Sequence, residues 1–159
     1  NIKDIYFWTL GSFAAKTWPH FFIVLLYFII GFIFMIYNNK NLDLMLLGRT
    51  EAQLLGQDIY KVRRQILLIT SLLAAGVVSV TGIIGFVGLV TPHVVRIFTG
   101  PMHKKLLIYS VFAGGIFLTT ADTIARSLLN QELPVGIVTA IFGAPFFIYL
   151  IYSSRREVM

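Results

Sequence analysis

The sequence predicts an all-α fold, a polytopic transmembrane helical bundle with about five membrane segments. Of its 159 residues 57% are apolar and only 13% are charged, and this charged fraction is about half that of a soluble domain. The net charge is +6. The basic residues lie between apolar runs, which is typical of orientation in a lipid bilayer, and we therefore expect membrane lipid and no nucleic acid as a partner.

Four apolar runs approach the roughly 20 residues that cross about 30 Å of hydrocarbon. They cover residues 20–37, 66–95, 106–125 and 134–152. The second run is too long, because a single helix from Gln65 to Val95 would extend to about 46 Å. It contains the residue types at which membrane helices bend or break, namely Gly76, Gly82, Gly85, Gly88 and Pro92.

The distribution of Lys and Arg decides how many spans this run contains. A single span would divide the thirteen basic residues six against seven, which gives no orientation. A turn near residues 82–85 places ten of them on one side, as the positive-inside rule requires. We therefore predict five spans, at 20–37, 66–82, 85–97, 106–125 and 134–153. Segment 85–97 is too short to cross alone and is expected to be re-entrant or strongly tilted.

This topology places the stretch 1–16 and the turn 126–133 outside the cell, and the segment 40–64 in the cytoplasm. The chain opens at Asn1, and no signal-peptide pattern precedes its first apolar stretch. We therefore interpret it as a fragment of a longer multi-pass membrane protein.

The sequence contains few of the residue types and motifs that enzymes use for catalysis. It contains no cysteine, which excludes thiol nucleophiles and thiolate metal sites. It has no phosphate-binding Gly-Lys-Ser or Gly-Lys-Thr and no Gly-x-Ser-x-Gly elbow. We expect no catalytic residue and no cofactor.

The three histidines do not suggest a metal site. His20, His93 and His103 are far apart and lack a His-x-x-x-His spacing or a nearby carboxylate companion. We expect His20 and His103 to be solvated. His93 follows Pro92, and we expect it to take a structural role at a helix break.

The cytoplasmic segment 41–65 is the most informative polar stretch. Thr50 is placed to cap a short helix that Gly56 would stop. Several leucines accompany the charges. These features suit a docking helix as well as an interfacial helix on lipid headgroups, and the composition does not separate the two.

Asp122 and Arg126 stand four residues apart near the outer end of a span. This spacing places them on one helix face, and an intramembrane charge is costly unless it is paired. We predict a structural ion pair. A proton relay would need further carboxylates within the spans, and the spans contain none.

Several phrases, in their order along the chain, closely resemble the C-terminal half of the FecCD-type permeases of bacterial ABC importers for iron chelates and cobalamin. The resemblance covers essentially the whole chain. Its phrases are residues 7–12, Leu47-Gly48 with Glu51-Ala52 and Leu55-Gly56, residues 85–93 with Arg96, Ala121-Asp122 with Arg126, and residues 132–140 with 143–147.

The resemblance implies a ten-span subunit in the bacterial cell membrane, of which residues 1–159 would supply one permease domain fragment, spans six to ten. It implies three partners: cytoplasmic ABC ATPase subunits, an extracytoplasmic substrate-binding protein and a second permease subunit. ATP hydrolysis would occur in the ATPase subunits. The cargo would be a ferric siderophore, haem or cobalamin.

The same resemblance makes part of segment 41–65 the ATPase-coupling region. The residues implied are Arg49, Glu51, Ala52, Gln53, Leu55 and Gly56. Gln53 departs from the family's Glu-Ala-Ala pattern, and Thr91 stands where an aliphatic residue is more usual. Helix-break or pathway candidates are Gly82, Gly85, Gly88, Pro92 and His93.

Three alternatives stay open. A zinc or manganese ABC permease is the nearest. A stand-alone secondary transporter or channel would work without ATP and without a partner at segment 41–65. An integral membrane enzyme would need a clustered polar site, which this sequence does not show.

Overall fold

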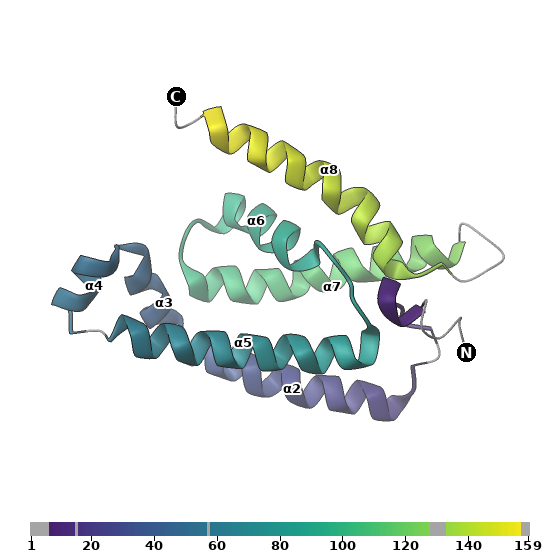
Figure 1. The fold of residues 1–159 in the computed structure, drawn as a ribbon, viewed down its shortest axis with the longest axis horizontal. Coiled ribbons are helices and arrows are strands. Elements are labelled where there is room, and N and C mark those ends of the chain that lie inside the picture. Colours follow the sequence, from purple (N-terminus) through teal and green to yellow (C-terminus); the bar gives the residue numbers. More distant parts are fainter. Residues whose placement is uncertain (1–6, 15, 57, 128–132, 157–159) are drawn as a thin grey trace.

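The computed structural model describes residues 7–14, 16–56, 58–127 and 133–156, and these form a helical bundle (Figure 1). Residues 7–10 are helical. The longer elements are α2 (Trp18–Tyr37), α3 (Asn39–Leu46), α4 (Arg49–Leu54), α5 (Ile59–Thr81), α6 (Val87–Thr99), α7 (His103–Ser127) and α8 (Val135–Arg156).

Four of these helices, α2, α5, α7 and α8, are long and apolar enough to cross a membrane, and α6 is a shorter apolar helix. The long uncharged run is divided by the non-helical residues 82–86. The predicted division of this run and the short segment predicted at 85–97 are therefore confirmed.

The end of the bundle that the predicted topology places in the cytoplasm contains more helix than the sequence predicted. α5 begins at Ile59, seven residues before the predicted span, and α3 was not predicted at all. Asp58 caps α5, because its Oδ1 accepts the backbone N–H of Lys61 at 3.1 Å. Apolar runs reveal only the lipid-embedded part of a helix, so its polar first turns were missed.

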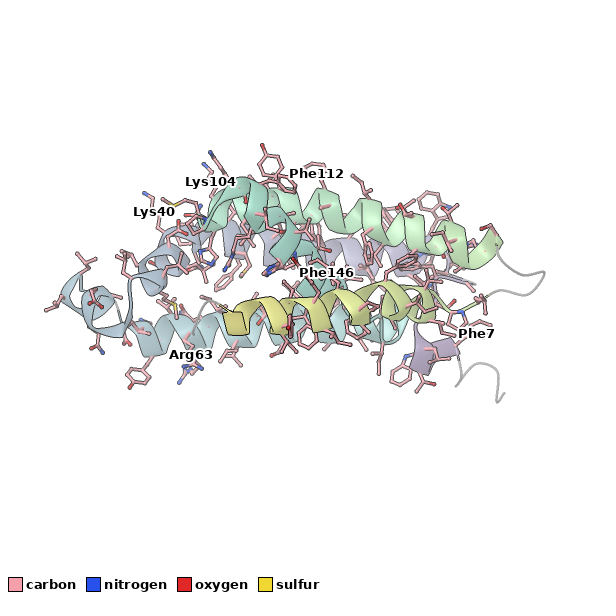
Figure 2. The ribbon with its side chains drawn as sticks, turned by 90° about the horizontal axis from the view of Figure 1, so that it is seen from above. Phe7, Lys40, Arg63, Lys104, Phe112 and Phe146 are labelled. Atoms are coloured by element: carbon pink, nitrogen blue, oxygen red, sulfur yellow. The ribbon has the colours of Figure 1, made fainter. Side chains whose placement is uncertain are left out.

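The two ends of the bundle differ in charge. α3, α4 and the start of α5 lie at one end, and the end of α5 and the start of α8 lie at the other (Figure 1). Figure 2 shows Lys40, Arg63 and Lys104 at the α3–α4 end and Phe7 at the opposite end. This arrangement agrees with the orientation that the positive-inside rule predicts.

Small residues let the antiparallel helices α2 and α5 approach each other. A Cβ atom on Gly31 of α2 would overlap the side chain of Leu73, and one on Gly76 of α5 would lie against the ring of Tyr27. In lipid, where apolar burial gives little drive for association, such close packing is a main source of helix pairing.

The opposite end of the bundle, which the predicted topology places on the outer side of the membrane, is held together by backbone hydrogen bonds between three distant segments. We call it the outer end. The N–H of Ser12 donates to the carbonyl of Thr81 at 2.8 Å, and the N–H of Ile83 donates to Trp8 at 3.3 Å. The N–H of Gly136 donates to Gly11 at 3.3 Å. These bonds satisfy backbone groups that lie outside the helices or near helix ends. We call this meeting of residues 8–12, 81–83 and 134–136 the outer junction.

Glycine is required where the chains of the outer junction touch. Gly11 and Gly82 have φ of 70° and 75°, a region that side chains strain. A Cβ on Gly82 would overlap the carbonyl oxygen of Trp8, and one on Gly136 would overlap that of Leu10.

The best-buried apolar cluster lies beside the outer junction. Ala121 and Ala125 of α7 pack with Val135 and Val138 of α8. Thr139 is fully buried, and its hydroxyl donates to the carbonyl of Gly136 at 3.1 Å. The outer end of the bundle is therefore the most constrained part of the described chain.

Gly136→Ala should destabilise the full-length protein, because its new Cβ meets a backbone oxygen that cannot move without breaking the outer junction. Overpacking of this kind costs about 1–3 kcal/mol, so the thermal midpoint in detergent should fall. Gly114→Ala is the matched control, since its Cβ would meet only the Thr91 methyl carbon at 3.8 Å. Equal midpoints for the two variants would contradict the importance of the junction.

Candidate functional site

The candidate coupling helix α4 begins on a glycine in an unusual conformation. Gly48 has φ 108° and ψ 166°, values that essentially only glycine adopts. Its carbonyl accepts the N–H of Ala52 at 3.2 Å. Gly48 is therefore the N-cap residue, and Thr50 lies inside the first turn of the helix. The prediction that Thr50 caps this helix is wrong.

The other end of α4 is closed by backbone bonds. The N–H of Leu55 donates to Glu51 at 3.2 Å, and that of Gly56 donates to Gln53 at 2.9 Å. Gly56 then turns the chain with φ 80°. The six-residue helix is thus bounded by a positive-φ glycine on each side.

The residues of α4 separate into a buried and an exposed group. Ala52 is completely buried, whereas Glu51 and Gln53 are exposed. Leu54 is 83% and Leu55 62% exposed. Leu54 and Leu55 are therefore exposed to solvent near the Glu51 carboxylate, at the basic end of the bundle. A surface of this kind suits a protein partner.

A carboxylate from α3 holds the first residue of α7. Asp43 Oδ1 accepts the backbone N–H of His103 at 2.8 Å and lies 2.7 Å from its Nδ1. The two side chains are only 28% and 16% exposed. The expectation that His103 is solvated is therefore wrong.

The contact between Asp43 and His103 was missed because it joins residues 60 positions apart in sequence. The useful signal was weak: both residues lie at the predicted cytoplasmic boundary. His20, which was also predicted to be solvated, makes exposed contacts with Thr17. Its Nδ1 accepts the Thr17 N–H at 3.3 Å and lies 2.8 Å from the Thr17 hydroxyl, so it helps to cap α2.

The helix break lies at residues 82–86 and not at Pro92. Gly82 ends α5, and Phe86 starts α6 with φ 67° in the left-handed region. Pro92 lies inside α6, so its predicted role as a break, with His93 beside it, is wrong. A helix can accept a proline where local adjustment and neighbouring groups satisfy the backbone.

Phe86 was not predicted as a site residue, although it fixes the turn against α8. A Cβ on Gly143 would overlap the side chain of Phe86. The glycine therefore leaves room for the ring. No pattern in the sequence marks a phenylalanine for a left-handed conformation.

The five pathway candidates do not meet at one place. Gly88 and Pro92 line a cavity of about 330 Å³ together with residues of α2, α5 and α7. His93 instead approaches α8, where its ring is 6.1 Å from that of Phe146. Gly82 belongs to the outer junction. A Cβ atom on Gly85 would have no neighbouring atom within 4 Å, so Gly85 lies beside open space.

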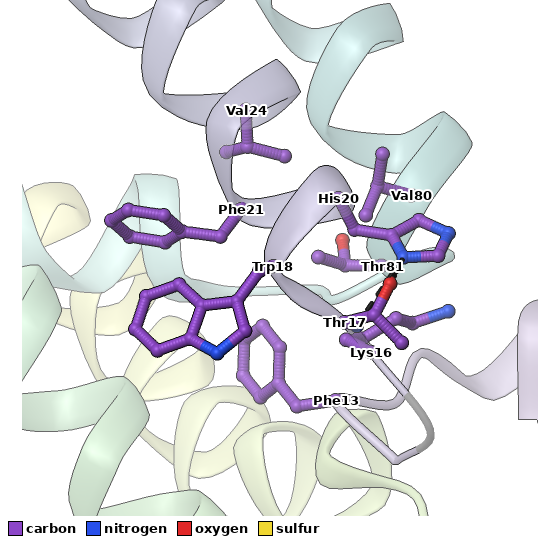
Figure 3. A pocket seen from close by; sticks show the side chains of 9 residues that line it. All are labelled: Phe13, Lys16, Thr17, Trp18, His20, Phe21, Val24, Val80 and Thr81. Atoms are coloured by element: carbon purple, nitrogen blue, oxygen red, sulfur yellow. Dashed lines mark hydrogen bonds between the residues drawn. The ribbon is translucent and has the colours of Figure 1, made fainter.

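A second cavity, of about 520 Å³, lies at the outer end (Figure 3). Its lining residues are Phe13, Lys16, Thr17, Trp18, His20, Phe21, Val24, Val80 and Thr81. Trp18 is 74% exposed and meets Phe21 edge to face at 5.8 Å. Exposed Trp beside Lys is typical of a membrane–water boundary.

Arg126 and Asp122 form an ion pair on α7, with Nε 2.8 Å from Oδ2. The arginine side chain is 50% exposed and the aspartate side chain 25%. The adjacent Ala121 and Ala125 are buried against α8. The structural role of this pair stays a prediction.

Within residues 7–14, 16–56, 58–127 and 133–156, no cluster of three or more His, Asp or Glu could hold a metal ion. Sequence comparison with known families finds that the family described as the FecCD transport family matches residues 1–153.

Curated relatives and a solved structure agree with this match. The iron(3+)-hydroxamate import system permease FhuG of Bacillus subtilis is 41% identical over 93% of this chain and 44% of its own. The cobalamin import permease BtuC of Halobacterium salinarum is 39% identical over 99% and 42%. An inward-facing structure of a protein assigned as a metal-chelate type ABC transporter is 33% identical, with a TM-score of 0.88 over 96% and 49%.

Gly48→Ala should change the position of α4, because the new side chain would strain a backbone region reserved for glycine. Spin labels on Leu54→Cys and Lys104→Cys in the full-length protein would report the α4-to-α7 distance. The distance distribution should broaden or shift. Leu47→Ala, at an exposed residue with ordinary helical backbone angles, is the control and should leave it unchanged. An unchanged distribution in Gly48→Ala would show that the glycine does not position α4.

Proposed function

Because this chain belongs to the FecCD transport family, a family of ABC permeases, we propose that it is part of the translocating subunit of an importer for iron chelates or cobalamin. The chain is a multi-pass membrane protein and spans under half the length of the curated relatives it matches. Its complete activity therefore belongs to the longer protein, in the bacterial cell membrane.

The observation that carries the proposal is the exposure pattern of α4. Ala52 is buried while Leu54, Leu55 and Glu51 face outward, and α4 lies outside the membrane-length helices. An interfacial helix would place its apolar residues in lipid. The neighbouring carboxylate and the two flanking turns instead favour a helix that docks into a cleft of a partner protein. We assign that cleft to a cytoplasmic ABC ATPase subunit.

In this mechanism the chain performs no chemistry. ATP binding closes two ATPase subunits, and the closure displaces α3 and α4 as a rigid body. The membrane helices then reorient so that a central pathway opens alternately to the two sides. The break at residues 82–86 lets α6 move without bending α5.

Two further partners complete the proposed importer. A second permease subunit, identical or paralogous, would complete the pathway, and an extracytoplasmic substrate-binding protein would deliver the cargo to the outer face. The two curated relatives above are named for cobalamin and for iron(3+)-hydroxamate. These two names support a cobalamin or iron-chelate cargo over free zinc or manganese ions.

Glu51→Arg in the full-length protein should prevent docking, because it reverses the charge beside the exposed leucines. We expect it to lose the ATPase on co-purification and to reduce ATP-driven uptake in liposomes at least tenfold, equivalent to about 1.4 kcal/mol of contact energy. Gln65→Arg is the matched control: it adds a positive charge at an exposed position on α5, outside α4. It should retain the ATPase.

The proposal fails if neither the wild-type protein nor the control binds an ATPase. Uptake that continues without ATP would favour a stand-alone transporter. Loss of binding in both arginine variants would show that the docking surface extends beyond α4.

A further inference from the structure

We propose that Asp43 is a positioning residue that transmits movement of the coupling segment to α7. This inference rests on the proposed function, since it concerns how a displacement of α3 and α4 reaches the membrane helices. It adds a residue that no sequence pattern had marked, and it assigns a specific contact for the transfer.

The geometry of the contact is that of a cap supplied by another helix. A single oxygen, Asp43 Oδ1, accepts the backbone N–H of His103 at 2.8 Å and lies 2.7 Å from its ring Nδ1. The carboxylate oxygen accepts the backbone hydrogen bond, and it also accepts one from the ring in the tautomer that carries hydrogen on Nδ1. The first N–H groups of a helix lack internal partners and favour negative charge, and charge-assisted bonds are the stronger kind.

α3 depends on this contact because apolar burial holds it only weakly. All eight of its residues are described, and none is fully buried. At its start, buried Asn38 bonds the Phe34 carbonyl and the Asn41 amide, both at 3.0 Å. These bonds fix α3 to α2 locally, whereas Asp43 joins it to a helix 60 residues further along the chain.

α7 is well suited to carry the displacement across the membrane. It runs from His103 to Ser127, with the Asp43 contact at its first residue. Near its other end Ala121 and Ala125 pack against Val135 and Val138 beside the outer junction. A force applied at the basic end would therefore tilt α7 about a fixed outer end.

The test uses the full-length permease with its ATPase, reconstituted in liposomes, and measures cargo transported per ATP hydrolysed. Asp43→Ala should still bind and stimulate the ATPase, but the ratio should fall at least about fivefold, the lower range of coupling between sites. Asp43→Asn retains an acceptor oxygen and should keep most of the ratio. A loss of folded protein alone would lower both rates together and leave the ratio unchanged.

Asp58→Ala is the matched control. Asp58 also caps a helix at this end, but its bond to the Lys61 N–H stays at the start of α5. Its transport ratio should change less than about twofold. If Asp43→Ala does not fold, His103→Ala removes the ring contact and keeps the backbone bond, and it should lower the ratio in the same direction.

The outcomes separate this inference from the proposed function. A wild-type protein that binds no ATPase overturns the proposed function itself. A coupled wild type with an unchanged ratio in Asp43→Ala, or in His103→Ala where that variant is used, overturns only the role of Asp43. An equal fall of the transport ratio in Asp58→Ala also overturns it. The ratio would then depend on any helix cap at this end of the bundle, and not on the contact between α3 and α7.

Discussion

Every backbone N–H and C=O group that leaves regular helix in an apolar setting needs a partner inside the protein, and the outer junction supplies those partners. The Ser12 N–H donates to the carbonyl of Thr81, the last residue of α5, and the Ile83 N–H donates to that of Trp8. At the start of α8, the Gly136 N–H donates to the carbonyl of Gly11. The glycines let three chains touch where side chains would keep them apart. Because α5 can stop here, residues 82–86 can run back as an irregular segment and α6 can be only thirteen residues long. The return of α6 in turn places the basic ends of the helices together.

The opposite end of the bundle is built differently. α4 buries Ala52 and exposes Leu54, the C-cap residue Leu55 is also exposed, and α3 has no buried residue. Polar contacts at Asn38 and Asp43 hold α3, and Asp58 caps the start of α5. A bundle that is tightly joined at one end and attached through a few directional bonds at the other can turn a displacement at the second end into a change of helix tilt. This division of rigidity is the structural basis of the proposed coupling.

The sequence predicted the features that the membrane imposes. Length, apolar runs and the distribution of Lys and Arg suffice for five spans, because lipid restricts both helix length and charge. The order of the motifs was enough to indicate the family. Contacts across the fold were not predictable in the same way. The Asp43–His103 contact joins distant residues, the left-handed Phe86 depends on space left by Gly143, and Pro92 is accommodated within α6. The polar helix α3 was missed because no apolar periodicity marks it.

The central claim is that α3 and α4 lie in the cytoplasm while the outer junction faces the opposite side. The chain has no cysteine of its own, so single cysteines can report this directly once any others in the full-length protein are replaced. A membrane-impermeant maleimide should label Trp8→Cys in intact cells and Leu54→Cys only after the membrane is permeabilised. Labelling of Leu54→Cys in intact cells, with Trp8→Cys protected until permeabilisation, would invert the topology and contradict the account.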